Sequence, residues 1–171
     1  MVQVRSKSVG ADAAGDGRFE GTRILIIEAR FYEHIADALV AGAVAEIEAM
    51  GAAYERIVVP GALEIPQVLV AAVAAGRFDE GAADYDGVVA LGCVIRGETS
   101  HYDIVVNNAN HWLMDVAIGQ AIPVGNGILT VDTEAQAMAR AEGGRAGKGG
   151  DAARACFALI DAARRFQGED A

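Results

Sequence analysis

The sequence contains little of what disulfide-bonded or metal-binding proteins require. It has 2 Cys and 3 His in 171 residues. Cys93 and Cys156 both lie in apolar patterns, which favours buried thiols over a disulfide. The histidines do not have the spacing to Cys, Asp or Glu residues that zinc sites show. We therefore expect no metal site and a reducing, cytoplasmic setting.

Positive charge and long apolar runs are also scarce. Lys and Arg number 14 against 24 Asp and Glu, which gives a formal net charge of −10. This charge argues against nucleic acid or an anionic membrane as a partner, and an anionic substrate needs local cations. No apolar run approaches the length of a membrane span, and residues 1–21 lack the apolar core of a signal peptide.

The chain is, however, rich in short apolar segments. Hydrophobic residues make up 53% of it, enough for a substantial core or for subunit interfaces. Segments typical of strands occupy residues 23–29, 54–59, 87–91 and 124–130. Those at 23–29 and 87–91 are near-continuous apolar runs, as buried parallel strands are. Helical patterns follow after residue 32, at 62–76, from about 103, at about 132–140 and at about 151–166. In the last of these, Leu159 is expected to face inward beside Cys156.

The alternation of strands and helices predicts an α/β fold. We expect a flavodoxin-like three-layer sandwich, with a four-stranded parallel sheet and helices on both faces. No repeat or linker divides the chain, so residues 22–167 are expected to form a single domain. Residues 1–21, rich in Ala, Gly, Asp and Ser, and residues 168–171 are expected to be terminal tails.

The segment at residues 91–103 holds the groups best suited to chemistry. It follows the third predicted strand, and open parallel sheets place ligands at the carboxyl ends of their strands. Thr99 and the backbone N–H groups beside Gly97 can hold an anion, and His101 can transfer a proton near neutral pH. On pattern alone, the alternatives are an ordinary helix cap at Thr99 and a solvated side chain at His101.

The loops after the other strands and helices supply further candidates. Phe31 can stack on a planar ring, or it is an ordinary core aromatic. Glu64 can accept hydrogen bonds from a ligand, or it compensates the dipole of the helix that it begins. Arg140 and Lys148 flank a Gly-rich turn and can bind phosphate, or they are simply solvated. The motifs G-x-G-x-x-G, Walker and G-x-S-x-G are absent, which argues against a nicotinamide enzyme, an NTPase or a serine hydrolase.

Several blocks of sequence resemble one family. They are Arg30-Phe31, residues 60–66 (PGALEIP), residues 92–103 (GCVIRGETSHYD) and residues 127–130 (GILT). In order and composition they resemble the 6,7-dimethyl-8-ribityllumazine synthases, and the resemblance runs from about Arg23 to Phe166. The chain looks most like the bacterial type with Ala-Arg-Phe-Tyr and Gly-Asn-Gly-Ile-Leu-Thr, for which a free pentamer is the usual assembly.

The resemblance implies the penultimate step of riboflavin synthesis, a transferase reaction. In it, 5-amino-6-(D-ribitylamino)uracil condenses with 3,4-dihydroxy-2-butanone 4-phosphate to give 6,7-dimethyl-8-ribityllumazine, phosphate and water. No cofactor or metal takes part. The implied partners are these small molecules and further copies of the chain, because sites in this family lie between adjacent subunits.

The same resemblance implies the roles of individual residues. His101 is the acid/base of the reaction. Contacts to the uracil and its ribityl chain are implied for Phe31, Ala62, Leu63, Glu64, Cys93, Val94, Ile95 and Asn126. Contacts to the phosphate are implied for Glu98, Thr99, Arg140 and Lys148, with Arg140 coming from the neighbouring subunit.

The chain departs from the family pattern in places that bear on binding and assembly. Asn126 stands where many members have an aromatic residue, and Leu63 replaces a frequent aromatic, so we expect a weaker hold on the uracil. Residues 142–150 lack the usual Gly-Thr-Lys-x-Gly-Asn-Lys form, which favours a pentamer over an icosahedral shell. A flavin- or lumazine-binding module without turnover and a mainly structural shell protein stay open as alternatives.

Overall fold

The computed structural model describes residues 17–79, 81 and 83–168. Its centre is one sheet built from β1 (Arg23–Ala29), β2 (Ala53–Val59), β3 (Gly87–Ile95) and β4 (Val124–Val131). These strands form a 4-stranded sheet in the order β2-β1-β3-β4, and every neighbouring pair is parallel. The predicted four-stranded parallel sheet is confirmed.

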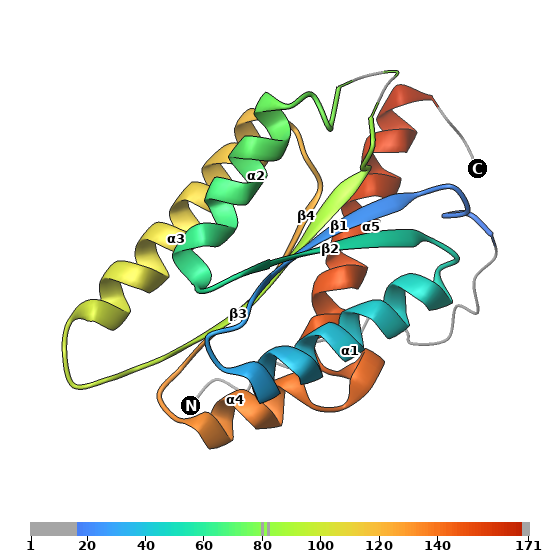
Figure 1. Ribbon diagram of the computed structural model, residues 1–171. Helices are drawn as coiled ribbons and strands as arrows, with labels where there is room; N and C mark the ends of the chain where they lie inside the picture. The colour runs from blue at the N-terminus through green and yellow to red at the C-terminus, as the bar shows by residue number, and fades with distance from the viewer. Residues whose placement is uncertain (1–16, 80, 82, 169–171) are drawn as a thin grey trace, which may run out of the picture.

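Helices cover both faces of the sheet (Figure 1). On one face lie α1 (Glu33–Ala49), α4 (Glu134–Ala141) and α5 (Lys148–Gln167), and on the other lie α2 (Ile65–Ala74) and α3 (His101–Gly119). Short 3-10 turns, η1 (Ala62–Glu64) and η2 (Gly144–Ala146), precede α2 and α5. The arrangement is the predicted three-layer α/β sandwich.

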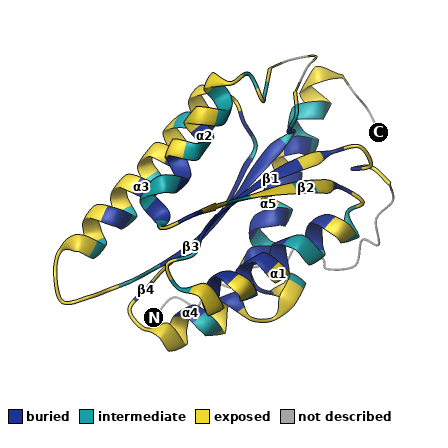
Figure 2. Ribbon diagram, viewed as in Figure 1, coloured by how far each residue is buried: buried dark blue, intermediate teal, exposed yellow. Residues whose placement is uncertain are grey.

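Strand β1 shows why both faces are covered. Ile24 and Ile26 belong to the core under α1 and α5, whereas Leu25 and Ile27 belong to the core under α2 and α3. All of these side chains have 0% exposure, because successive residues of a strand face opposite sides of the sheet. Figure 2 shows the result, with β1 buried between helices whose outer surfaces are exposed, whereas the edge strand β2 is largely exposed.

The structure corrects three element boundaries and one helix face. β3 continues to Ile95 and α3 begins at His101, so the loop between them is shorter than residues 91–103. The last helix begins at Lys148 instead of residue 151. Leu159 is 48% exposed, contrary to the prediction, and Phe157 at 2% lies in the core beside Cys156.

The glycines of β4 allow close packing against a helix. A Cβ atom at Gly125 would lie 1.9 Å from the backbone oxygen of Ala152 in α5. A side chain at this position therefore cannot be accommodated without moving the helix. The glycine lets α5 rest directly on the sheet.

At the amino-terminal end of the described chain, Phe19 is 2% exposed, although the predicted tail of residues 1–21 includes it. Its ring packs against Phe157, with 4.6 Å between the ring centroids. Residues 1–16 and 169–171 of the two predicted tails lie outside the described residues. In the described part of the chain, the helices are all too short or too polar to cross a membrane.

Candidate active site

A pocket of about 380 Å³ opens at the carboxyl ends of β1, β2 and β3. Strand β1 leads into α1 on one face of the sheet, and β3 leads into α3 on the other face. The connections that follow these two neighbouring strands therefore leave the sheet on opposite faces. This is the switch point at which open α/β sheets bind ligands.

Most of the predicted site residues meet in this pocket. Its walls include Phe31, Ala62, Leu63, Glu64, Cys93, Val94, Ile95, Thr99 and His101. Phe31 is 72% exposed at the rim, so the alternative of an ordinary core aromatic is wrong. Its ring meets that of Tyr32 edge to face, with 5.0 Å between centroids. The pocket thus combines an accessible aromatic face, a carboxylate and an imidazole.

His101 is placed by the start of a helix. It is the first residue of α3, and its backbone N–H donates to the side-chain oxygen of Thr99, with 3.4 Å between the atoms. Ser100, the N-cap residue, makes no side-chain cap bond, so Thr99 serves one of the free amides of this helix end. The capping alternative for Thr99 and a place in the pocket wall are therefore compatible. The imidazole of His101 is exposed and available for proton transfer.

Arg96, the cation of the same loop, braces the loop and does not line the pocket. Its guanidinium contacts Asp103 at 3.4 Å and Asp132 at 3.3 Å. It also lies over the ring of Tyr102, 4.1 Å from the centroid. Arg96 thereby ties the first turn of α3 to the loop that follows β4.

The loop that carries Phe31 is anchored by a buried carboxylate that sequence reasoning missed. Glu28 has 0% exposure, and its oxygens accept from Arg30 at 3.0 Å and from Arg56 at 2.7 Å. Arg30 also donates to Asp37 at 2.5 Å. Hydrogen bonds to Asp37 and Glu28 raise the pKa of Arg30, so it stays charged beside Phe31. The only sequence signal was a lone Glu in an otherwise apolar strand.

Cys93 lies in the pocket wall but is a poor nucleophile. It is 9% exposed, and burial raises its pKa to about 11. The thiol therefore stays protonated near neutral pH. Because the thiolate is the reactive form, Cys93 reacts slowly there. Cys93 acts as a small apolar surface.

Several predicted phosphate- or uracil-contacting residues lie outside the pocket of their own chain. Glu98 is exposed in the loop before α3, and its side chain is not part of the wall. Asn126 is in β4 and bonds to Asn110, while Arg140 donates to the carbonyl of Gln136 in α4. Lys148 begins α5 and contacts Asp151. A single chain thus brings the aromatic and the imidazole together but not these two cations.

The pocket also has wall residues that were not predicted. They are Tyr32, Pro60, Gly61, Gly97, Tyr102 and Val105. Each is a near neighbour, in the chain, of a predicted residue, and all but Tyr32 and Val105 lie within the sequence blocks described above. Their nearness in the sequence to predicted residues was the only clue to them. Nearness does not show which neighbouring side chains face the pocket.

A parallel α/β sandwich with an aromatic-rimmed pocket and a histidine at its switch point defines a flavodoxin-like domain with a small-molecule site. Comparison with known proteins specifies it further. Residues 21–164 match the family described as 6,7-dimethyl-8-ribityllumazine synthase. The chain belongs to this family, and the resemblance noted from the sequence is confirmed.

Curated relatives of that name cover most of the chain. The protein of Azorhizobium caulinodans is 53% identical over 145 residues, which is 85% of this chain and 88% of the relative. That of Nitrobacter hamburgensis is 50% identical over 146 residues, again 85% and 88% of the two chains. That of Xanthobacter autotrophicus is 49% identical over 167 residues, 98% of this chain and 99% of the relative.

Proposed function

We propose that the chain is a 6,7-dimethyl-8-ribityllumazine synthase, which condenses 5-amino-6-(D-ribitylamino)uracil with 3,4-dihydroxy-2-butanone 4-phosphate and releases phosphate and water. The observation that carries this proposal is the meeting of Phe31, Glu64 and His101 in one pocket of a chain that belongs to this family. The amine nucleophile comes from the substrate. The site therefore needs a proton carrier and a binding surface more than a nucleophilic side chain.

The residues of the pocket wall are suited to different roles around the pyrimidine. The exposed ring of Phe31 stacks on the uracil. The segments at 62–64 and 93–95 hold its edge and the ribityl chain, with Glu64 as an acceptor for ring N–H or hydroxyl groups. His101 moves protons during imine formation, phosphate loss and ring closure, and such a group contributes about 10²–10⁴-fold. Holding two substrates side by side supplies roughly 7–11 kcal/mol more.

The phosphate is held at the β3–α3 loop. Thr99 and the backbone N–H of Glu98 face the anion, while the Glu98 carboxylate stays exposed to solvent. Arg140 and Lys148 of the adjacent subunit complete the phosphate site, and Asn126 of that subunit closes over the pyrimidine. This arrangement accounts for the position of all three outside the pocket of their own chain.

A homo-oligomer with shared sites is supported by the exposed surface of α3, which Figure 2 shows as a largely unburied helix face. The exposed apolar side chains on this helix are Ile104 (54%), Trp112 (52%), Met114 (39%) and Ile118 (75%). Large apolar side chains left exposed along one helix favour a subunit contact. We propose a pentamer, and a cytoplasmic location, where the two unpaired thiols would remain reduced.

The test is an assay of the purified protein with both substrates. Lumazine absorbance and released phosphate are followed together, and the spontaneous condensation is subtracted. We expect equal amounts of both products, with rates lowered in His101→Ala and Arg140→Ala. Arg165→Ala, which removes another exposed arginine, is the control and keeps the wild-type rate. A protein that binds lumazine or riboflavin but releases no phosphate above background would instead be a binding module.

A further inference from the structure

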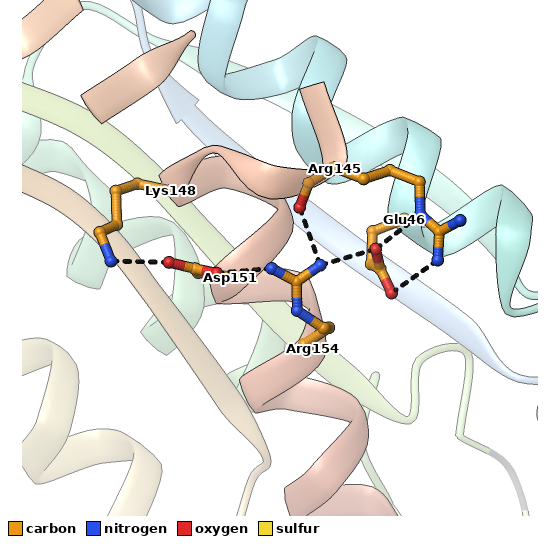
Figure 3. Close-up of polar contacts among 5 residues, drawn as sticks. All are labelled: Glu46, Arg145, Lys148, Asp151 and Arg154. Carbon is orange, nitrogen blue, oxygen red and sulfur yellow. Dashed lines mark hydrogen bonds and ion pairs between the residues drawn. The ribbon is translucent and has the colours of Figure 1, made fainter. Parts of the chain in front are cut away.

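A cluster of charged side chains joins α1 to the start of α5 (Figure 3). Glu46 of α1 is 1% exposed, and one of its oxygens lies 2.8 Å from Arg145 Nε and 2.8 Å from Arg154 Nη1. Arg145 belongs to η2 and Arg154 to α5. A single buried carboxylate thus binds both the turn and the helix that follows it.

The contact continues from Glu46 to Lys148. Arg154 donates to the backbone oxygen of Arg145 at 2.8 Å and to one carboxylate oxygen of Asp151 at 2.5 Å. The other carboxylate oxygen of Asp151 lies 2.6 Å from Lys148 Nζ. Burial alone would raise the pKa of Asp151, but the bonds from Lys148 and Arg154 outweigh it and lower that pKa. Asp151 therefore stays charged and keeps hold of Lys148.

The backbone around η2 and the start of α5 is rich in glycine. Gly143 and Gly144 have positive φ angles of 102° and 56°, a region that glycine enters freely. A Cβ at Gly149 would lie 1.9 Å from the backbone oxygen of Leu39, and one at Gly42 would lie 2.5 Å from that of Gly144. Glycines thus let the turn lie flat against α1. The bonds from Glu46, one helical turn after Gly42, then add side-chain anchoring to a Gly-rich segment.

The cluster also bears on the local charge. Arg145, Arg154 and Lys148 outnumber the carboxylates Glu46 and Asp151, so the group carries net positive charge in a chain of formal net charge −10. Lys148 is its exposed member, at the amino end of a long helix. Its ammonium is the group of the cluster that is best placed to meet an anion from outside the chain.

We propose that Glu46 is a positioning residue that holds Lys148, through Arg154 and Asp151, in the place where it meets the substrate phosphate. Glu46 itself touches no substrate. The inference rests on the proposed function, in which Lys148 contacts the phosphate of the four-carbon substrate in the adjacent subunit's pocket. It assigns a role in substrate affinity to a buried carboxylate on the opposite face of the sheet from α2 and α3.

The test is the variant Glu46→Gln, which keeps the side-chain size and removes the charge. We expect the KM for the phosphate-bearing substrate to rise about 3- to 10-fold, as for loss of a charge-assisted bond of modest strength. The KM for the pyrimidine and the sedimentation coefficient should stay as in the wild type. Glu48→Gln, on an exposed position of the same helix, is the matched control and changes neither KM.

A double-mutant cycle separates positioning from general destabilisation. If Glu46 acts through Lys148, Glu46→Gln has no further effect on the phosphate-substrate KM in a Lys148→Ala background. Arg154→Lys, which keeps the charge but loses the branched contacts, serves as a second variant where Glu46→Gln fails to fold, and we expect the same selective rise in KM.

Three results would overturn the inference while leaving the proposed function intact, and the first two concern the single variants. They are a wild-type KM in these variants, and an equal rise in both KM values. Additive effects of Glu46→Gln and Lys148→Ala would do the same. A wild-type protein that makes no lumazine would remove the proposed function and this inference with it.

Discussion

The side-chain amide of Asn126 donates a hydrogen bond to the side-chain oxygen of Asn110, with 2.7 Å between the two atoms. The oxygen of Asn126 accepts from the backbone N–H of Ile128 at 3.0 Å, and Asn110 in turn donates to the carbonyl of Val106 at 2.9 Å. Asn126 thus ties β4 to α3. In the proposed shared site, it would present an amide already engaged in hydrogen bonds, instead of an aromatic face, to the substrate of the next subunit.

Replacing Asn126 by Phe is therefore expected to tighten substrate binding. An aromatic ring adds about 0.5–1.5 kcal/mol of stacking beyond its buried area, which corresponds to a KM for the pyrimidine about 2- to 10-fold lower. Asn126→Leu is the control, because it removes the same hydrogen bonds without adding a ring. Steady-state kinetics of both variants check this. Equal KM values for the Phe and Leu variants would show that an aromatic ring at position 126 does not tighten pyrimidine binding by stacking.

The buried carboxylate of Glu28 should matter for stability. Glu28→Gln weakens charge-assisted bonds from Arg30 and Arg56 in a water-poor place, so we expect a loss of about 1.5–3 kcal/mol in the free energy of unfolding. Glu55→Gln is the comparison, because Glu55 also pairs with an arginine of a neighbouring strand, Arg23, but its side chain is 45% exposed.

Urea unfolding at matched protein concentration measures both variants, since oligomers unfold in a concentration-dependent way. Glu55→Gln should cost less than about 1 kcal/mol. Similar losses for the two variants would mean that burial of Glu28 adds nothing to its ion pairs.

The raised pKa values of the thiols predict slow alkylation. The pKa of Cys93 is about 11 and that of Cys156 about 12, both raised by burial, so the neutral thiol is the favoured form in the folded protein. At pH 8, about one Cys93 side chain in a thousand is a thiolate.

Mass spectrometry after iodoacetamide treatment should therefore show little labelling of either cysteine at pH 8, and full labelling in urea. Labelling of folded Cys93 should rise with pH toward 11. Rapid modification of folded Cys93 at pH 8 would contradict the assignment of this thiol as an inert wall residue.

The layers of the fold were predictable because each strand is a short, mainly apolar segment and each connection carries a helical pattern. The bounds of β1 agree with the predicted 23–29, and β4 differs by one residue, Val131. The end of β3 was not predictable, since Cys93, Val94 and Ile95 belong equally to a strand and to a substrate-binding loop. Nor was the close approach of α5 to Gly125 predictable, because it depends on tertiary packing that the strand pattern does not contain.

The candidate site was predictable where its residues lie at strand ends. Parallel strands bring these ends to one edge, so Phe31, Glu64 and His101 had to come near one another. The ion pairs of the buried carboxylates Glu28 and Glu46 were not predicted. Most of their arginine partners are distant in the chain, and a carboxylate among apolar residues does not show which arginine it binds. Nor does the sequence of one subunit say which side chains reach another subunit.

Subunit complementation between two variants tests whether the active site is shared between adjacent subunits. His101→Ala and Arg140→Ala, each with its own affinity tag, are dissociated, mixed in equal amounts and reassembled, and mixed assemblies are purified through both tags. If each site takes His101 from one subunit and Arg140 from its neighbour, random mixing in a closed ring restores about a quarter of the sites. We predict recovery of about that share of wild-type lumazine formation. Activity no higher than that of the separate variants, in assemblies shown to contain both, would contradict a site shared between subunits.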